Sequence, residues 1–347
     1  MEFRSLAAKT LIQSSVVALV VAACLVLVFG AEVWFVVFAG MLYAIILNRM
    51  AAWITRKTGL PEKWAVAFSI TAPLLLFGAA AWLLAPDVTG QASELARRLP
   101  EAATKLRDDA LGYDWVVRLV GQMETLQASL PSSSRLVNFA AGAVASTVGA
   151  LGNILLAFVV GVFLAINPRI YVGGLLRLVP PRRRARAQEV LAETESTLAA
   201  WLIAKLLSMA AIGVLTLLGL WLIGIDLALV LALIAAMLSF IPNVGPVLAL
   251  VPAVLIALVA GPDEVLYVVS LYVGVQIVES YVLTPYLQQK MLELPPALTV
   301  GTQVLLGVLA GALGVILATP LTAAAVVMTR MWYVEDLLGD RPPRATG

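Results

Sequence analysis

Long apolar runs alternate with short polar or glycine- and proline-rich segments along most of the chain. Six runs have roughly the 20 residues that a helix needs to cross a hydrocarbon core. They cover residues 11–30, 33–53, 64–85, 136–166, 197–223 and 265–287. The pattern predicts an all-α polytopic membrane protein with about six full spans.

Four further apolar runs are too short to cross. They cover residues 226–240, 247–260, 298–310 and 315–328, and each provides only about 20–22 Å of helix against a core of about 30 Å. Breaker-rich segments join them in pairs, at 239–246 and at 311–314. We predict two re-entrant helical hairpins, because non-helical backbone inside a membrane must be buried by protein or line a watery cavity. Two tilted full spans joined by a buried turn are the alternative.

Each predicted hairpin follows a full span. Span 197–223 precedes a hairpin that enters from outside, and span 265–287 precedes one that enters from inside. Two such units of opposite topology form an inverted repeat, with a binding site expected near the membrane midplane between them.

Residues 87–135 are the polar exception. Leu95 and Leu99 belong to an apolar stripe with helical spacing on an otherwise polar segment. We expect a small external helical layer, with a new helix beginning at Pro100, that packs on the membrane domain or on a neighbouring subunit. A solvated amphipathic hairpin is the alternative.

Composition narrows the function classes. The 347 residues are 61% hydrophobic and 13% charged, with a mean hydropathy of +0.97, which excludes a soluble protein. The net charge of +2 gives no support for a nucleic-acid partner. The chain has no histidine and a single cysteine, Cys24, so histidine metal sites and intramolecular disulfides are excluded. Without a nucleophile constellation or a phosphate loop, we expect neither an enzyme nor a cofactor.

Six arginines lie between residues 168 and 195, in a segment expected to be a loop. Because Lys and Arg in short loops face the cytoplasm, this loop and both termini are expected inside and the 87–135 layer outside. The arginines can also bind anionic lipid headgroups. The expected parts are scaffold helices (1–86), the external layer (87–135), a membrane helix with the arginine loop (136–195), a unit with both hairpins (196–330) and a cytoplasmic tail (331–347).

Polar residues inside the apolar segments are the candidate site. A charge within a span costs about 2.5–3.5 kcal/mol, so Glu279 should face the protein interior or a watery pathway and bind a proton or cation. The alternative is a purely structural role for Glu279, as the partner of a polar group such as Lys205. Lys205 either extends to the cytoplasmic surface or pairs with Glu279, and Gln276 shares the helix face of Glu279. The candidate solute- or ion-binding residues are Lys205, Pro242, Asn243, Gly245, Pro246, Gln276, Glu279, Thr284 and Gln303, with Na⁺ expected near Asn243 and Glu279 if the cargo is a cation.

Four groups of residues together carry a family signature. They are 239–246 with Val251-Pro252-Ala253, Gln276-Ile277-Val278-Glu279 with Thr284-Pro285, 311–320, and Phe163-Leu164 with Pro168-Arg169 and Val179-Pro180-Pro181-Arg182. They resemble the autoinducer-2 exporter family of bacterial inner-membrane proteins, and the resemblance runs over about residues 10–338. Members of that family often carry a histidine where this chain has Pro295.

The resemblance implies a secondary transporter. Some members of the family are linked to export of a quorum-sensing signal, and others to sodium or lithium efflux in exchange for protons. We therefore expect a small polar solute or a monovalent cation as cargo, moved by alternating access. The expected assembly is a homo-oligomer in membrane lipid, with a pentamer as one candidate. An oligomeric channel and a membrane scaffold protein are the alternative functions.

Overall fold

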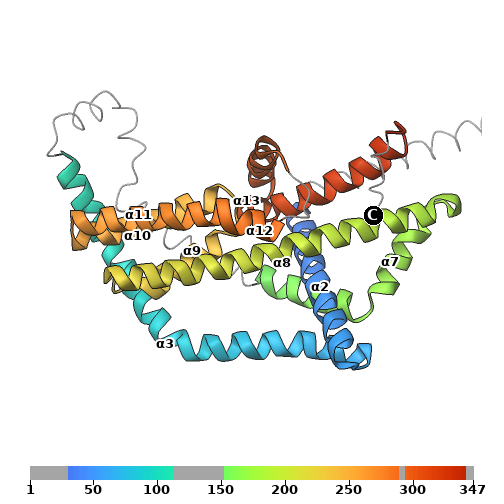
Figure 1. Cartoon of the computed structure of the whole chain (residues 1–347), viewed down its shortest axis with the longest axis horizontal. Helices are drawn as coiled ribbons and strands as arrows, with labels where there is room; N and C mark the ends of the chain where they lie inside the picture. The colour runs from blue at the N-terminus through green and yellow to red at the C-terminus, as the bar shows by residue number, and fades with distance from the viewer. Residues whose placement is uncertain (1–29, 112–151, 289–293, 341–347) are drawn as a thin grey trace, which may run out of the picture.

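The structure, a computed structural model, describes residues 30–111, 152–288 and 294–340, with the backbone alone for 101–111. All regular secondary structure in these ranges is helical (Figure 1). The elements are α2 (Ala31–Thr58), α3 (Glu62–Leu111), helix Gly152–Ile166, α7 (Pro168–Arg177), η1 (Pro181–Arg183), α8 (Arg184–Ile223), α9 (Ala228–Leu238), α10 (Val244–Ala260), α11 (Pro262–Val278), the π-helix η2 (Glu279–Leu283), α12 (Thr284–Gln288), α13 (Pro296–Thr329) and the π-helix η3 (Arg330–Glu335).

The described helices confirm an all-α polytopic membrane protein. Five are long and apolar enough to cross a membrane, or six if helix Gly152–Ile166 and α7, which meet at 85°, form one span. The predicted span 11–30 lies outside the described residues. One of the five long apolar segments, Pro296–Glu335, contains a sharp break and does not run straight.

The break in α13 makes it a hairpin. Ala310 and Gly311 leave the helical conformation, with φ −138° and +59°. Residues on either side then face each other, because the hydroxyl oxygens of Thr302 and Thr322 share a hydrogen bond at 2.9 Å. This contact joins the arms of the second predicted hairpin, which we call hairpin 2.

The first predicted hairpin is α9 and α10, joined by a short turn; we call it hairpin 1. A Cβ atom on Gly245 would overlap the carbonyl group of Leu238 on the opposite arm. Gly314 stands in the same relation to Leu306 in hairpin 2. The two hairpins therefore share a close approach of their arms that only glycine allows, and this is a residue-level match between the two repeats.

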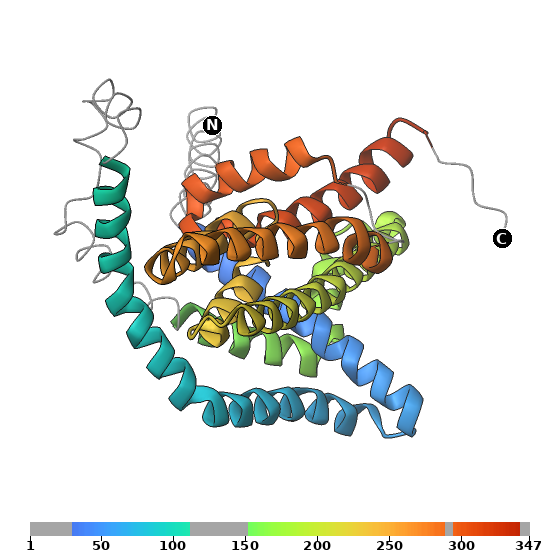
Figure 2. The ribbon, with the colours of Figure 1, turned by 60° about the vertical axis from the view of Figure 1, so that its left-hand side comes forward.

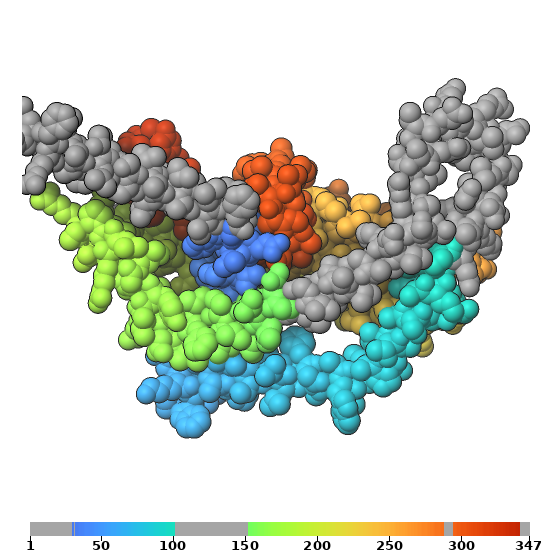
Figure 3. Space-filling model, turned by 180° about the vertical axis from the view of Figure 1, so that it is seen from behind, coloured from blue at the N-terminus to red at the C-terminus, as the bar shows by residue number. Residues whose placement is uncertain are grey.

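Helix α3 differs from the expectation. A new helix was predicted at Pro100, but α3 runs unbroken for 50 residues with Pro73, Pro86 and Pro100 inside it. That prediction was wrong, because a proline removes one hydrogen bond and bends a helix without ending it when alanine- and leucine-rich flanks favour helix on both sides. Figures 2 and 3 show the helix curving along one side of the molecule.

The C-terminal half of α3 packs on hairpin 1. Leu95 is buried in the same apolar cluster as residues of α9 and α10, with Leu99 beside it. The N–H of Val230, in the first turn of α9, donates to Gln91 Oε1 at 3.1 Å. Of the two arrangements expected for the external layer, its described part adopts packing on the membrane domain.

The expected arginine-rich loop is largely helical. It consists of α7, η1 and the first three turns of α8, because no proline interrupts residues 182–223. Arg186 donates from its guanidinium to Glu189 (3.0 Å), Glu335 (2.8 Å), Asp336 (2.9 Å) and the carbonyl of Met331 (3.1 Å). Arg186 thus fastens the C-terminal end of hairpin 2 to the beginning of α8.

Helix α2 packs against hairpin 2 and α8. Its Phe35 and Leu42 lie in one apolar cluster with Leu317 and Ala323 of α13 and Trp201 of α8. Figure 3 shows α2 in blue beside the orange arm of hairpin 2.

Helix Gly152–Ile166 packs against α2 through glycines. A Cβ on Gly161 would lie 2.7 Å from the carbonyl oxygen of Gly40. The sequence places further glycines at 142 and 149, and these two positions lie outside the described residues.

Candidate functional site

Glu279 lies where the α-helix of α11 changes into the π-helix η2. Pro285 explains the change, because proline lacks an N–H and its ring clashes with the carbonyl four residues earlier. The chain accommodates this by widening the turn, and the N–H of Thr284 bonds to the carbonyl of Glu279, five residues back. Single π-turns of this kind are frequent at functional sites.

Glu279 pairs with Lys205 across the interface of α11 and α8. The Lys205 Nζ lies 3.3 Å from Glu279 Oε1, and Ser208 Oγ donates to the same oxygen at 3.2 Å. Lys205 and Glu279 are both buried, 7% and 8% exposed. Of the two arrangements expected for Lys205, the structure shows pairing with Glu279.

A cavity of about 190 Å³ adjoins this pair. It lies between hairpin 1, α8 and α11, and its walls are apolar with a few polar groups, as in small-molecule sites. Its lining includes the side chains of Thr216, Ser239, Pro246, Tyr272, Gln276 and Glu279.

Tyr272, like Thr216 and Ser239, lines this cavity and was missed by the sequence interpretation. It is 9% exposed and its buried hydroxyl has no hydrogen-bond partner. An unsatisfied buried polar group costs about 1–3 kcal/mol, so it calls for an explanation. Tyr272, Gln276 and Glu279 follow i, i+4, i+7 spacing, which places them on one helix face. That spacing was the sequence signal that could have identified Tyr272, and the helix face that it defines lines the cavity.

The turn of hairpin 1 has an unusual conformation. Asn243 has φ +66° and ψ −43°, and the N–H of Val244 donates to the carbonyl of Pro242 at 2.8 Å. This is a γ-turn of the rare form with positive φ. For a residue other than glycine such a conformation costs on the order of 1–3 kcal/mol, so the surroundings must hold it.

A residue of hairpin 2 contacts this turn. Gln303, 3% exposed, donates from Nε2 to the carbonyl oxygen of Pro242 at 3.3 Å, and its buried Oε1 has no hydrogen-bond partner. We call Pro242, Asn243 and Gln303 the hairpin junction. Gln303 lies on the first arm of hairpin 2, well before the break at Gly311. The turn of hairpin 1 therefore meets an arm of hairpin 2, not its turn.

The structure brings together only part of the predicted set. Lys205, Glu279, Gln276 and Pro246 lie at the cavity or its edge, whereas Pro242, Asn243 and Gln303 form the separate junction. Gly245 serves the close approach of the arms, and Thr284 is half-buried beside the π-turn. Among the described residues, no group of three or more Cys, Asp and Glu side chains is arranged to hold a metal ion.

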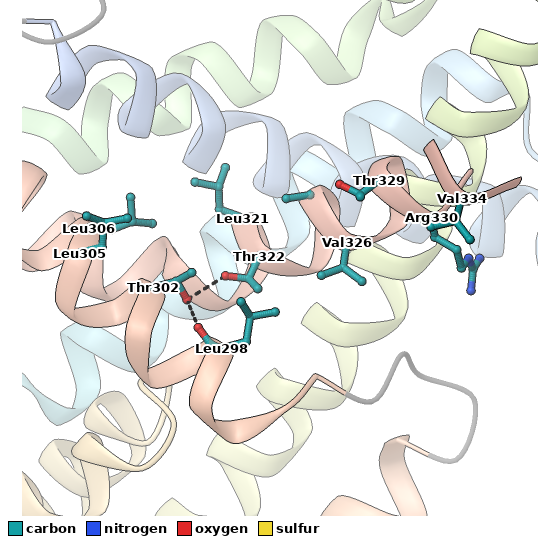
Figure 4. Close-up of a pocket in the computed structure, with 11 residues that line it drawn as sticks. Leu298, Thr302, Leu305, Leu306, Leu321, Thr322, Val326, Thr329, Arg330 and Val334 are labelled. Carbon is teal, nitrogen blue, oxygen red and sulfur yellow. Dashed lines mark hydrogen bonds between the residues drawn. The ribbon is translucent and has the colours of Figure 1, made fainter. Parts of the chain in front are cut away.

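A larger groove, about 420 Å³, lies between the arms of hairpin 2 (Figure 4). Leucine, valine and alanine side chains dominate its wall. The hydroxyl groups of Thr302 and Thr322 are hydrogen-bonded to each other and to helix carbonyls. It has no acid, and its one charged residue, Arg330, lies at an end (Figure 4). The smaller cavity at Glu279 is therefore the better candidate for a polar cargo.

Comparison of the sequence with known proteins places the chain in a family. The model of the AI-2E family transporters matches residues 16–333. The chain is 25% identical over 298 residues to YrrI of Bacillus subtilis (strain 168), covering 82% of each protein. It is 24% identical over 302 residues to YhhT of Escherichia coli (strain K12), covering 83% of this chain and 81% of the relative. Both relatives carry provisional names as transport proteins. The chain therefore belongs to the AI-2E transporter family.

Proposed function

We propose that the protein is a secondary transporter that exports a small polar solute, or exchanges Na⁺ or Li⁺ for H⁺, with Glu279 as the coupling group. Membership of a transporter family supplies the general activity. The observation that supports the finer proposal is the buried Lys205–Glu279 pair beside a cavity that both repeats line. Since the sequence has no phosphate-binding loop, the energy comes from an ion or solute gradient.

The pair acts as a switch because its partners neutralise each other. Leaving one charge buried without the other costs about 3–5 kcal/mol. A proton on Glu279, or a cargo cation at Oε1, takes the place of the Lys205 ammonium, which then needs water or another acceptor. Occupancy of the cavity is thereby coupled to the packing of α8 against α11.

Alternating access uses the inverted repeat. The unit of α8 with hairpin 1 and the unit of α11 with hairpin 2 move together against the scaffold, so that the cavity between them opens to one side at a time. Residues 196–330 form the moving unit, and the scaffold is formed by residues 1–86. The protein lies in the bacterial inner membrane as a homo-oligomer among lipids, with both termini in the cytoplasm. Labelling of Ser133→Cys from outside intact cells, with Arg183→Cys protected, tests this orientation.

The decisive experiment measures flux in proteoliposomes under imposed proton and sodium gradients, with a panel of small polar solutes and with Na⁺ and Li⁺. Glu279→Gln keeps size and hydrogen bonding but removes the titratable charge, so gradient-driven flux should fall to background. Glu264→Gln, at the other end of the same helix, is the matched control and should transport normally.

Stability separates coupling from folding. Glu279→Gln leaves Lys205 buried without its partner, so the variant should melt earlier, and Lys205→Met added to it should restore the melting temperature but not the flux. Normal gradient-driven flux in Glu279→Gln would rule out Glu279 as the coupling group. Steady flux without any coupling gradient would favour a channel.

A further inference from the structure

The junction between the hairpins contains an observation that the cavity does not explain. Asn243 is the non-glycine residue with positive φ in the described part of the chain, and its side chain is exposed. A conformation of this kind persists only where neighbours over-determine it.

Backbone hydrogen bonds and side-chain contacts hold the turn, and three of them bear on its position. The Pro242 carbonyl accepts from the N–H of Val244 within the turn and from Gln303 Nε2 of hairpin 2. The ring of Phe240 packs edge-on against Trp201 of α8, with centroids 5.7 Å apart. Of these contacts, the one from Gln303 crosses between the two repeats.

The turn is connected to the cavity. Ser239 and Pro246, on either side of the turn, both line the space beside Glu279. A change in the turn therefore moves one wall of that cavity. Gln303 does not line it, and so acts on the cavity through the turn.

We propose that Gln303 is a positioning residue that joins the two hairpins throughout the transport cycle, so that they move as one body and do not separate as gates. Its Nε2 holds the Pro242 carbonyl and thereby the strained turn at Asn243. This inference rests on the proposed transport function. The competing role is direct binding of the cargo by the unpartnered Oε1.

Two substitutions separate positioning from cargo binding. Gln303→Glu keeps the acceptor oxygen but loses the donor to Pro242, and Gln303→Met keeps the length without either group. Positioning predicts that both variants lose flux by about tenfold, the scale of one hydrogen bond in a buried site. Val304→Ala, on an exposed neighbouring side chain, is the control and should transport normally. Wild-type flux in Gln303→Glu would overturn the proposal in favour of cargo binding.

A cross-link tests whether the hairpins move together. In a Cys24→Ala background, Pro242→Cys with Gln303→Cys should react with a short, cleavable bifunctional thiol reagent, and Pro242→Cys with Val304→Cys should not. Asn243→Cys can replace Pro242→Cys if the latter folds poorly. Before it is cross-linked, the variant with Pro242→Cys and Gln303→Cys should transport slowly, as is expected of Gln303→Met. The cross-link should then raise its flux severalfold.

Three results of the cross-linking experiment overturn the proposal as well. They are failure of the Gln303→Cys pair to cross-link, cross-linked protein that stays inactive, and flux that returns only on cleavage of the reagent. Cross-linking yield is measured without any transport, and wild-type flux is measured without any substitution. Failure of the junction and failure of the transport function are therefore distinguishable.

Discussion

Hairpin 1 and hairpin 2 each bring a glycine so close to the opposite arm that a side chain would collide with a carbonyl group. Beyond that shared backbone their chemistry differs. Hairpin 1 has a strained polar turn and lines the cavity at Glu279, whereas hairpin 2 turns at Gly311 and encloses an apolar groove. The repeat thus preserves the shape of the two hairpins and assigns the polar site to one of them.

The glycines are the sharpest test of the shared backbone. Gly245→Ala and Gly314→Ala should each destabilise the protein by about 1–3 kcal/mol or more, because the added methyl meets backbone that cannot move aside. Thermal unfolding in detergent measures this. Gly274→Ala, where a Cβ meets nothing within 4 Å, is the control and should unfold no earlier than the wild type, because alanine favours the helix of α11 over glycine. If only one of the first two variants were destabilised, the match between the hairpins would fail.

The difference in chemistry predicts opposite outcomes for two hydroxyl groups. Tyr272→Phe in the cavity should raise the cargo KM about tenfold, the equivalent of one hydrogen bond, without loss of stability, because the hydroxyl has no protein partner. Thr322→Val in the groove should lower stability by about 0.5–1.5 kcal/mol, because it breaks the link to Thr302, and should leave KM unchanged. Flux titrations and melting curves on both variants provide the comparison, which an unchanged KM in Tyr272→Phe would contradict.

The two hairpins also differ in the helices that hold them, and α3 holds hairpin 1. Gln91 accepts from the first turn of α9, so Gln91→Leu should lower stability by about 0.5–2 kcal/mol, the range of lost helix caps. Ser93→Ala, on the same helix but exposed and bonded only to the nearby Gly90 carbonyl, should have a smaller effect. Hydrogen exchange at the amides of α9 locates the change, and equal protection in both variants would show that α3 does not cap hairpin 1.

Much of the fold followed from segment length. Apolar runs too short to cross, with breakers between them, predicted both hairpins, since burial and backbone pairing leave few other arrangements in a membrane. The predicted helix start at Pro100 was wrong, because the helix-favouring residues on both sides of this proline outweigh its local preference for a helix start. The π-turn at Glu279 was invisible to periodicity, because it results from a clash one turn away at Pro285.

The candidate site was less predictable than the fold. Glu279 and Lys205 stood out as charges in apolar segments, but their pairing depends on the register of α8 against α11. Gln303 and Pro242 meet from segments 61 residues apart, and sequence spacing cannot predict such a contact. Tyr272 was overlooked because a tyrosine in an apolar helix has an ordinary packing explanation.

One long helix has a mechanical consequence. α3 begins beside α2, where Ala65 packs with Ala51 and Ile54, and its far half holds hairpin 1 through Leu95 and Gln91. With 50 residues it extends about 75 Å if straight, so it acts as a lever arm between two parts that alternating access would displace. Any such displacement must bend α3, and its internal prolines are where a helix flexes at least cost. The elastic energy of that bend would favour one end state and set the resting position of the cycle.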